Sequence, residues 1–256
     1  DFSPNSIGAH VNQPLFWPTP GVATGIGPMP GTDARDQTKV VAGELAEFPH
    51  IVELPARGPG ADRIGRTAVK LSEVDRSFEV ETSPSGWRLG HGGRHDRRAA
   101  TTWWSDDLEA LEECVGPEQV PIKIQVAGPW TLTAHITDIA GEALLRDAGA
   151  GTDIAAALAE AVGNLIVVVR RSCSGATIVI EVDEDEAPAV LDGRVRTSSG
   201  RYSHRHIEPA EYERNLATVL RAIAESEAVP AVRCHSARPP VDLFRSAGAQ
   251  AKIGRA

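Results

Sequence analysis

Short apolar runs alternate with helical stripes along this sequence, and this alternation restricts the possible folds more than any other feature. The clearest run, residues 176–182, is almost continuously apolar, which is typical of a strand buried on both faces of a sheet. Apolar residues then recur at helical spacing, as at Tyr212, Leu216 and Val219, before the next strand-like run begins. Strands that alternate with helices predict right-handed crossovers and a mostly parallel sheet, so the expected class is α/β.

The pattern predicts a strand at residues 22–26, 50–54, 120–126, 176–182, 229–232 and 249–253. It predicts helices around residues 41–48, 64–71, 104–115, 154–165, 212–223 and 241–247. Two alternating segments, 77–82 and 86–89, flank the turn signal Ser83-Pro84-Ser85 and indicate an inserted hairpin. Residues 1–21 contain several prolines without any period, so we expect an extended N-terminal arm before a domain that spans residues 22–256.

Two architectures are common for an α/β chain of 256 residues: an open doubly wound sheet and a closed barrel of eight strands. A doubly wound nucleotide-binding sheet usually has a glycine fingerprint after its first strand. The segment from Gly25 to Pro30 lacks that fingerprint, and its two prolines remove backbone donors that a phosphate needs. Six predicted strands are fewer than the barrel requires, so the residues alone leave both architectures open.

The charge of the chain restricts its partners. The net charge is −9, so the surface repels phosphate backbones on average and nucleic acid is not an expected partner. The apolar run 165–169 is far shorter than the roughly 18 residues that span a membrane, so no membrane partner is expected. Three cysteines without regular spacing fit a reducing compartment, and no signal peptide is visible, so we expect a cytoplasmic protein.

The predicted strand ends hold most of the unusual chemistry, and in parallel α/β folds ligands gather at the carboxyl ends of strands. Asp183 directly follows a buried strand, where it would bind a cationic amine or belong to a solvated acidic loop. Trp130 would stack on a planar ligand or pack in the core. Cys234 and His235 are residue types that bind zinc, although neighbours in an extended strand point to opposite faces.

Several of these strand ends together resemble one family. Residues 23–32, 53–62 and 126–132 are similar, in the same order, to the cobalamin-independent methionine synthase family, and the similarity extends over about residues 22–250. The nearest likeness is to single-domain actinobacterial members, whose barrel is shared with uroporphyrinogen decarboxylase. The resemblance implies a TIM-type (β/α)8 barrel, here truncated after about six strands, with the last two strands expected beyond Ala256.

The resemblance also implies a set of site residues. A zinc ion would bind the homocysteine thiol, and the thiolate would take a methyl group from methyltetrahydrofolate. The homocysteine side is expected to be formed by Ile26, Gly27, Glu53 and Asp183, and the folate side by Gly128, Pro129 and Trp130. The family's His-x-Cys zinc pair matches Arg233-Cys234-His235, so Arg233 replaces the ligand His and His235 replaces the ligand Cys. Arg233 cannot lose its proton to bind zinc, which leaves Cys234 and His235 as the candidate zinc ligands.

Two hypotheses follow from the resemblance. The first is a zinc-dependent S-methyltransferase that makes methionine from homocysteine, or methylates another thiol, with a folate donor. The second is a catalytically inactive or truncated remnant that binds at most an amino acid or a folate. A decarboxylase on the same barrel would need a basic pocket for several carboxylates, which the acidic strand end at Asp183 does not favour.

Overall fold

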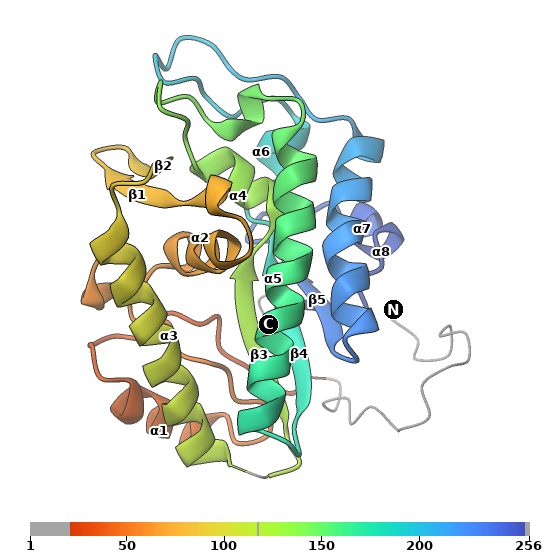
Figure 1. The fold of residues 1–256 in the computed structure, drawn as a ribbon. Helices are drawn as coiled ribbons and strands as arrows, with labels where there is room; N and C mark the ends of the chain where they lie inside the picture. The colour runs from red at the N-terminus through yellow and green to blue at the C-terminus, as the bar shows by residue number, and fades with distance from the viewer. Residues whose placement is uncertain (1–20, 117, 254–256) are drawn as a thin grey trace.

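A computed structural model describes residues 21–116 and 118–253, and it confirms the α/β class (Figure 1). Its main sheet has four parallel strands in the order β3-β4-β5-β6. These strands are β3 (Pro121–Ala127), β4 (Thr177–Asp183), β5 (Val229–Arg233) and β6 (Ala251–Ile253). Each lies within one or two residues of its predicted position, because the apolar run that sets a buried strand is local in the sequence. The proposed arm lies outside the described residues, apart from Gly21.

The predicted strands at 22–26 and 50–54 are not formed as strands. The chain instead makes isolated parallel bridges, Pro28 to Glu53 and His50 to Lys123. The amide of Met29 donates to the Glu53 carbonyl at 2.8 Å, and the Glu53 amide donates to the Gly27 carbonyl at 3.0 Å. The ladder cannot continue past Glu53, because the next donor of a parallel pairing would be the amide of residue 55, which is a proline. These bridges nevertheless place the 22–28 segment beside the 50–54 segment, and the 50–54 segment beside β3. Together with β3, β4, β5 and β6, the two segments therefore form a row of six parallel segments in sequence order.

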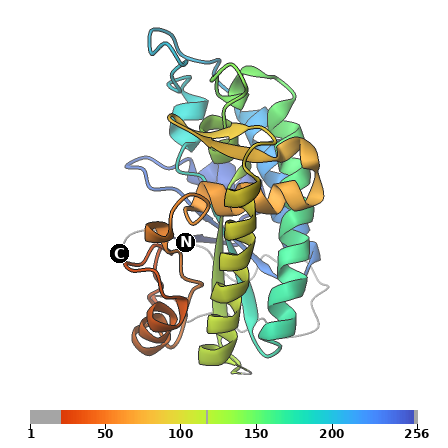
Figure 2. The same ribbon diagram turned by 60° about the vertical axis from the view of Figure 1, so that its left-hand side comes forward.

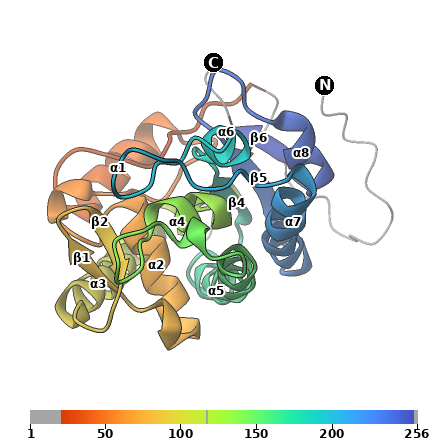
Figure 3. The same cartoon turned by 90° about the horizontal axis from the view of Figure 1, so that it is seen from above.

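Helices cover one face of the sheet (Figures 2 and 3). The longer ones are α1 (Ala34–Glu44), α2 (Arg63–Val74), α3 (Arg94–Val115), α5 (Ala150–Ser172) and α7 (Pro209–Glu225). The shorter ones are α4 (Pro129–His135), α6 (Ala187–Leu191) and α8 (Val241–Ser246), with 3-10 turns η1 (Pro55–Arg57), η2 (Arg76–Phe78) and η3 (Leu144–Arg146). Helix α5 packs against α2, α4 and α7 and forms the centre of this layer.

The ends of two helices show how the local sequence acts. Asp33 and Asp62 cap α1 and α2, because their carboxylates accept the amides of Asp36 at 3.0 Å and Gly65 at 2.9 Å. The expected continuation of α1 to Phe48 is wrong, since the helix ends at Glu44. Phe48 packs instead with Val179, Val229 and Ala231 in a separate apolar cluster.

Helix α5 is the one described helix that is long and apolar enough to cross a membrane. Half of its apolar window is buried inside the protein. Its buried positions include the predicted stripe of Ile154, Leu158, Val162 and Leu165. This pattern is that of a core helix in an α/β layer.

The inserted hairpin is confirmed as β1 (Val80–Ser83) paired antiparallel with β2 (Gly86–Leu89). It lies at the upper end of the molecule with α4 and α6 (Figure 1). Because α4 directly follows β3, this is the carboxyl end of the sheet. The Trp87 indole donates to the Asp62 carboxylate at 3.2 Å, which ties the hairpin to the start of α2.

Side chains alternate between the two faces of each strand. On the helix side, residues such as Ile122, Ile180 and Val232 belong to the main apolar core. On the other face, the apolar cluster around Phe48 also contacts Val22, Ala251 and Ile253, so it joins the first described segment to the last strand. This face, opposite the helices, is called the inner face below, and near the carboxyl ends of the strands it carries charged side chains. The described residues contain no closed ring of eight strands.

Candidate functional site

Arg63 stands at the centre of the charged inner face. It is the first residue of α2, and its side chain is only 12% exposed. Its guanidinium donates to both oxygens of Glu53, from Nε at 2.9 Å and from Nη2 at 3.1 Å. It also forms an ion pair with Asp183 and donates to the Ile26 carbonyl oxygen. One cation therefore contacts groups from the 22–28 segment, the 50–54 segment and the end of β4.

Gly27 lies against the same guanidinium. Its φ is 109°, a left-handed conformation that favours glycine. A Cβ atom there would collide with the Gln125 amide and lie 3.0 Å from Arg63 Nη2. The four residues expected on the homocysteine side, Ile26, Gly27, Glu53 and Asp183, are thus brought together around Arg63. Sequence reasoning did not single out Arg63, although this residue immediately follows Asp62, which caps α2 and ends the run 53–62 that carries the family resemblance.

Arg233 provides a second cation beside Asp183. Its guanidinium forms ion pairs with Asp183 and with Asp185, the latter at 3.0 Å, and its Nε lies 3.4 Å from Glu181 Oε1. Deeper in the sheet, Lys123 Nζ lies 2.9 Å from Glu181 Oε2, with both side chains fully buried. Burial lowers the pKa of Lys123, while the adjacent Glu181 opposes that shift. Four carboxylates and three cations therefore share this face.

Two carboxylate oxygens of the cluster, Asp183 Oδ1 and Glu181 Oε1, are buried and have no hydrogen-bond donor among the described residues. Glu181 Oε1 has Arg233 Nε at 3.4 Å as an ion-pair partner, and Asp183 Oδ1 lies at the end of β4. A buried acceptor without a donor is costly, so such an atom indicates a position that a ligand donor would satisfy. The neighbouring His50 does not supply a charge, because burial lowers its pKa to about 4 and leaves the ring neutral at pH 7.

Glu184 follows Asp183 and is fully buried. Burial raises its pKa to about 8. Its oxygens accept the amides of Trp130 at 3.1 Å and Thr131 at 3.2 Å, at the start of α4. A Cβ at Gly128 would collide with this carboxyl group, so the glycine makes room for it. The expectation for Asp183 did not extend to Glu184, whose only sequence signal is a second acid after a buried strand.

The residues expected on the folate side lie in the core. Gly128, Pro129 and Trp130 are all buried, and the Trp130 side chain has no exposed surface. Its ring stacks on Tyr212 with centroids 5.7 Å apart, and its Nε1 donates to the Tyr212 carbonyl at 3.1 Å. In this conformation Trp130 stacks on a core residue and presents no face to a ligand.

The residues present do not fit a zinc site. Cys234 is buried, and burial raises the pKa of its thiol to about 12. His235 is exposed and donates its backbone amide to Asp185. Arg233 lies between the neighbouring acids as their counter-ion. In residues 21–116 and 118–253, no group of three His, Cys, Asp or Glu side chains has the arrangement of a metal site.

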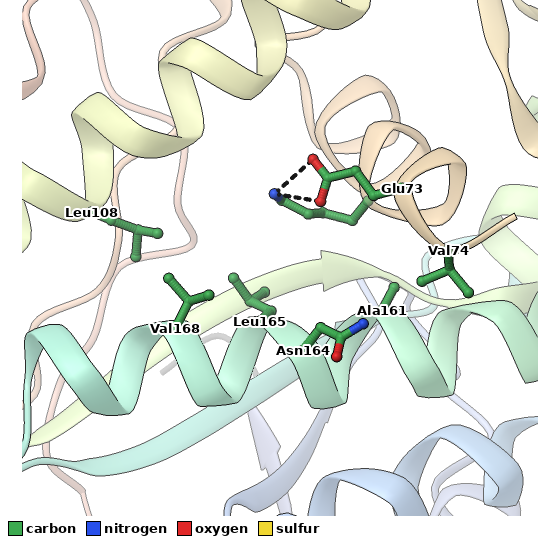
Figure 4. A pocket seen from close by; sticks show the side chains of 8 residues that line it. Glu73, Val74, Leu108, Ala161, Asn164, Leu165 and Val168 are labelled. Carbon is green, nitrogen blue, oxygen red and sulfur yellow. Dashed lines mark hydrogen bonds and ion pairs between the residues drawn. The ribbon is translucent and has the colours of Figure 1, made fainter. Parts of the chain in front are cut away.

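Two pockets are lined by residues outside the charged cluster. A small pocket of about 70 Å³ lies between α2, α3 and α5 in the helix layer, and Figure 4 shows Glu73 among its lining residues. Lys70, which also lines it, lies with its Nζ 3.0 Å from both oxygens of Glu73. Its other lining residues are Val74, Leu108, Ala161, Asn164, Leu165 and Val168. A larger, open hollow of about 480 Å³ lies between α6 and the loop after β5. Neither pocket is lined by a predicted site residue.

Searches of protein family models, curated proteins and solved structures found no match to this chain.

Proposed function

We propose that this chain is a barrel-type relative of the cobalamin-independent methionine synthase family whose charged cluster binds an α-amino acid. The proposal for the fold is supported by the order of the six parallel segments, which is the order of consecutive strands in a (β/α)8 barrel. A doubly wound sheet would instead reverse its strand order at one point. The proposal for the ligand depends on the residues at the strand ends.

The observation that carries the ligand proposal is the convergence of Ile26, Glu53 and Asp183 on one cation. A carbonyl and two carboxylates around a cation are the groups that recognise an ammonium ion. The unpaired Asp183 Oδ1 supplies a further acceptor for an amine. Arg233, beside it, is suited to the carboxylate of the same ligand, because a guanidinium binds carboxylates in a planar, two-point geometry.

The proposal does not include zinc-dependent methyl transfer by this chain. That activity needs at least three protein ligands at one point, and residues 21–116 and 118–253 contain no such group of His, Cys, Asp or Glu side chains. The residues thus favour amino-acid binding without the methyl transfer step that the family resemblance implies.

Isothermal titration calorimetry with homocysteine and with methionine tests the proposal. Saturable binding is expected for both, and N-acetylmethionine and 3-(methylthio)propionate, which lack the free amine, should not bind. The Asp183→Asn variant should lose binding, whereas Asp192→Asn, which alters an exposed ion pair with Arg194, should retain it. Equal binding of methionine and N-acetylmethionine, or no binding of either amino acid, would contradict the proposal.

A parallel assay addresses the methyltransferase hypothesis. Methionine formation is measured from homocysteine and methyltetrahydrofolate with zinc added, and no turnover above the protein-free rate is expected. Turnover that depends on zinc and disappears in a Cys234→Ala variant would show that a metal site forms in spite of the arrangement described above.

A further inference from the structure

The pocket that is proposed for the ligand amine already contains a cation from the protein. Arg63 Nε and Nη2 donate to both oxygens of Glu53, and its guanidinium also contacts Asp183 and the Ile26 carbonyl. Glu53 is 1% exposed and Asp183 is 3% exposed, so water does not compete strongly for these acceptors. Apart from Asp183 Oδ1, the acceptors expected to bind an amine are occupied by Arg63.

An ammonium group and this guanidinium cannot use the same acceptors at the same time. A primary ammonium has three donors, and each needs an oxygen near 2.8 Å. The Glu53 oxygens are bound by two guanidinium nitrogens in a fork that fixes the plane of the group. A ligand amine that reaches Glu53 must therefore move the Arg63 side chain out of the pocket.

The second arginine of the cluster is placed differently. Arg233 has Asp185 at 3.0 Å and Glu181 at 3.4 Å in addition to Asp183, so it keeps two partners if Asp183 turns to a ligand. Arg63 has one close carboxylate apart from Asp183, which is Glu53, while Glu181 lies 4.0 Å away. Arg63 would lose both of its close carboxylates to a ligand amine, and Arg233 would lose only one.

We infer that Arg63 is a built-in occupant of a cation-binding pocket formed by Ile26, Glu53 and Asp183, and that a ligand's cationic group must displace it. The inference deepens the amino-acid proposal and rests on it for the identity of the natural ligand. The inference gives Arg63 a role in specificity, because only a ligand whose own contacts outweigh the loss of the displaced ion pair will bind. A purely structural ion pair at this place would not leave a functional pocket when the arginine is removed.

The test replaces the missing guanidinium with a free one. In an Arg63→Ala variant, Glu53 and Asp183 lose a buried partner, and the melting temperature is expected to fall. Methylguanidinium at millimolar concentration should raise it again in a saturable way, relative to sodium chloride of the same ionic strength. The wild type should show no such rise. A matched variant, Arg35→Ala, removes an exposed arginine paired with Glu113 and should show no rescue.

A second variant locates the rescue. In Arg63→Ala/Glu53→Gln, the pocket loses the carboxylate that the guanidinium forks onto, and methylguanidinium should no longer stabilise the protein. If Arg63→Ala does not fold alone, it is refolded with and without methylguanidinium. Recovery of folded protein only when methylguanidinium is present supports the inference, and equal recovery with and without it contradicts the inference.

Amino-acid binding separates this inference from the proposed function. Methionine is expected to bind Arg63→Ala at least about tenfold more tightly than the wild type, since one charge-assisted interaction no longer has to be broken. Equal affinities would overturn the inference and leave the proposed function standing. Rescue by methylguanidinium without any binding of amino acids would uphold the cation pocket and overturn the proposed function. Absence of saturable rescue in a folded Arg63→Ala variant would overturn the inference.

Discussion

The buried pair of Lys123 and Glu181 gives an asymmetric prediction for stability. Both side chains are fully buried, with Nζ 2.9 Å from Oε2. Glu181 has two further cations nearby, Arg233 Nε at 3.4 Å and Arg63 Nη1 at 4.0 Å, whereas Lys123 has no second ion pair among the described residues. Removing one member of the pair therefore leaves very different surroundings for the other.

The distances set the size of the effect. At an effective dielectric constant of about 20, the attractions of Glu181 to Lys123, Arg233 and Arg63 are about 6, 5 and 4 kcal/mol before desolvation is counted. Lys123→Met removes the first but leaves about 9 kcal/mol, and it also removes the cost of burying the ammonium. We expect a loss of about 1 kcal/mol in the free energy of unfolding. Glu181→Met leaves an unpaired buried ammonium, and the expected loss is about 3 to 5 kcal/mol.

Urea unfolding at pH 7, followed by circular dichroism, measures both losses. The double variant Lys123→Met/Glu181→Met should be more stable than Glu181→Met alone, because it contains no uncompensated buried ammonium. Equal losses for the two single variants, or a larger loss for Lys123→Met, would refute the reasoning that Arg63 and Arg233 stabilise Glu181.

Four other predictions test the fold and the titrating groups. Asp107→Ala leaves the buried guanidinium groups of Arg57 and Arg66 without their shared carboxylate, so urea unfolding should show a loss of about 3 to 5 kcal/mol in the free energy of unfolding. Glu113→Ala on the surface should show a much smaller loss, and similar losses for the two variants would contradict the contrast in burial. Burial raises the pKa of Cys173 to about 11 and the pKa of Cys234 to about 12. A thiol reagent at pH 8 should therefore label the partly exposed Cys114 first, and Cys173 and Cys234 only after denaturation. Rapid labelling of Cys234 in the native protein would contradict its buried placement. His50 has a pKa of about 4 in the folded protein and 6.5 in the unfolded chain, so its contribution to the free energy of unfolding is complete above pH 6.5. That free energy should fall by up to about 3 kcal/mol as the pH falls to 4. A His50→Gln variant should not show this loss when unfolding is measured as a function of pH. Glu184 should change the stability in the opposite direction with pH, since its pKa of about 8 in the folded protein lies above the ordinary value of 4.5. Its contribution to the free energy of unfolding is complete below pH 4.5 and is lost as the pH rises through 8. A Glu184→Gln variant whose stability depends on pH in the same way as that of the wild type would refute this assignment.

The parts of the fold that were predicted correctly have strong local patterns. The apolar run 176–182 became β4, and Asp183 is its last residue, as its position after the run suggested. The Ser-Pro-Ser turn signal marks the turn of the observed hairpin, with Ser83 as the last residue of β1 and Pro84 and Ser85 in the loop. Helix α5 contains its predicted stripe because a wide apolar face must be buried against other elements.

The parts that were missed depend on contacts that are distant in the sequence. Helices α4 and α6 are only 7 and 5 residues long, too short for a helical period to be recognised. The 22–26 and 50–54 segments looked like strands, but whether a segment pairs along its length depends on its neighbour, and here only isolated bridges formed. Phe48 fits the stripe of α1 in the sequence, yet it packs with β4 and β5 across the sheet.

The site shows the same division. The resemblance indicated Ile26, Gly27, Glu53 and Asp183 together, and strand-end position alone would have suggested Asp183. Nothing in the sequence indicated that Arg63 would lie among them or that Glu184 would be buried at the start of α4. Nor did the sequence indicate that the Trp130 ring would stack on Tyr212. Side-chain partners of this kind are set by how α2, α4 and α7 pack on the sheet.

The α/β class, the buried strands, the long helices and the acidic strand end could be predicted from the sequence, because each depends on a periodicity or composition within a short window. Which charges neutralise one another depends on how elements that are distant in the sequence pack together. Ion pairs such as Arg63–Glu53, 10 residues apart, and Arg233–Asp183, 50 residues apart, form because the parallel strands end at the same edge, where water is excluded and each buried charge requires a partner.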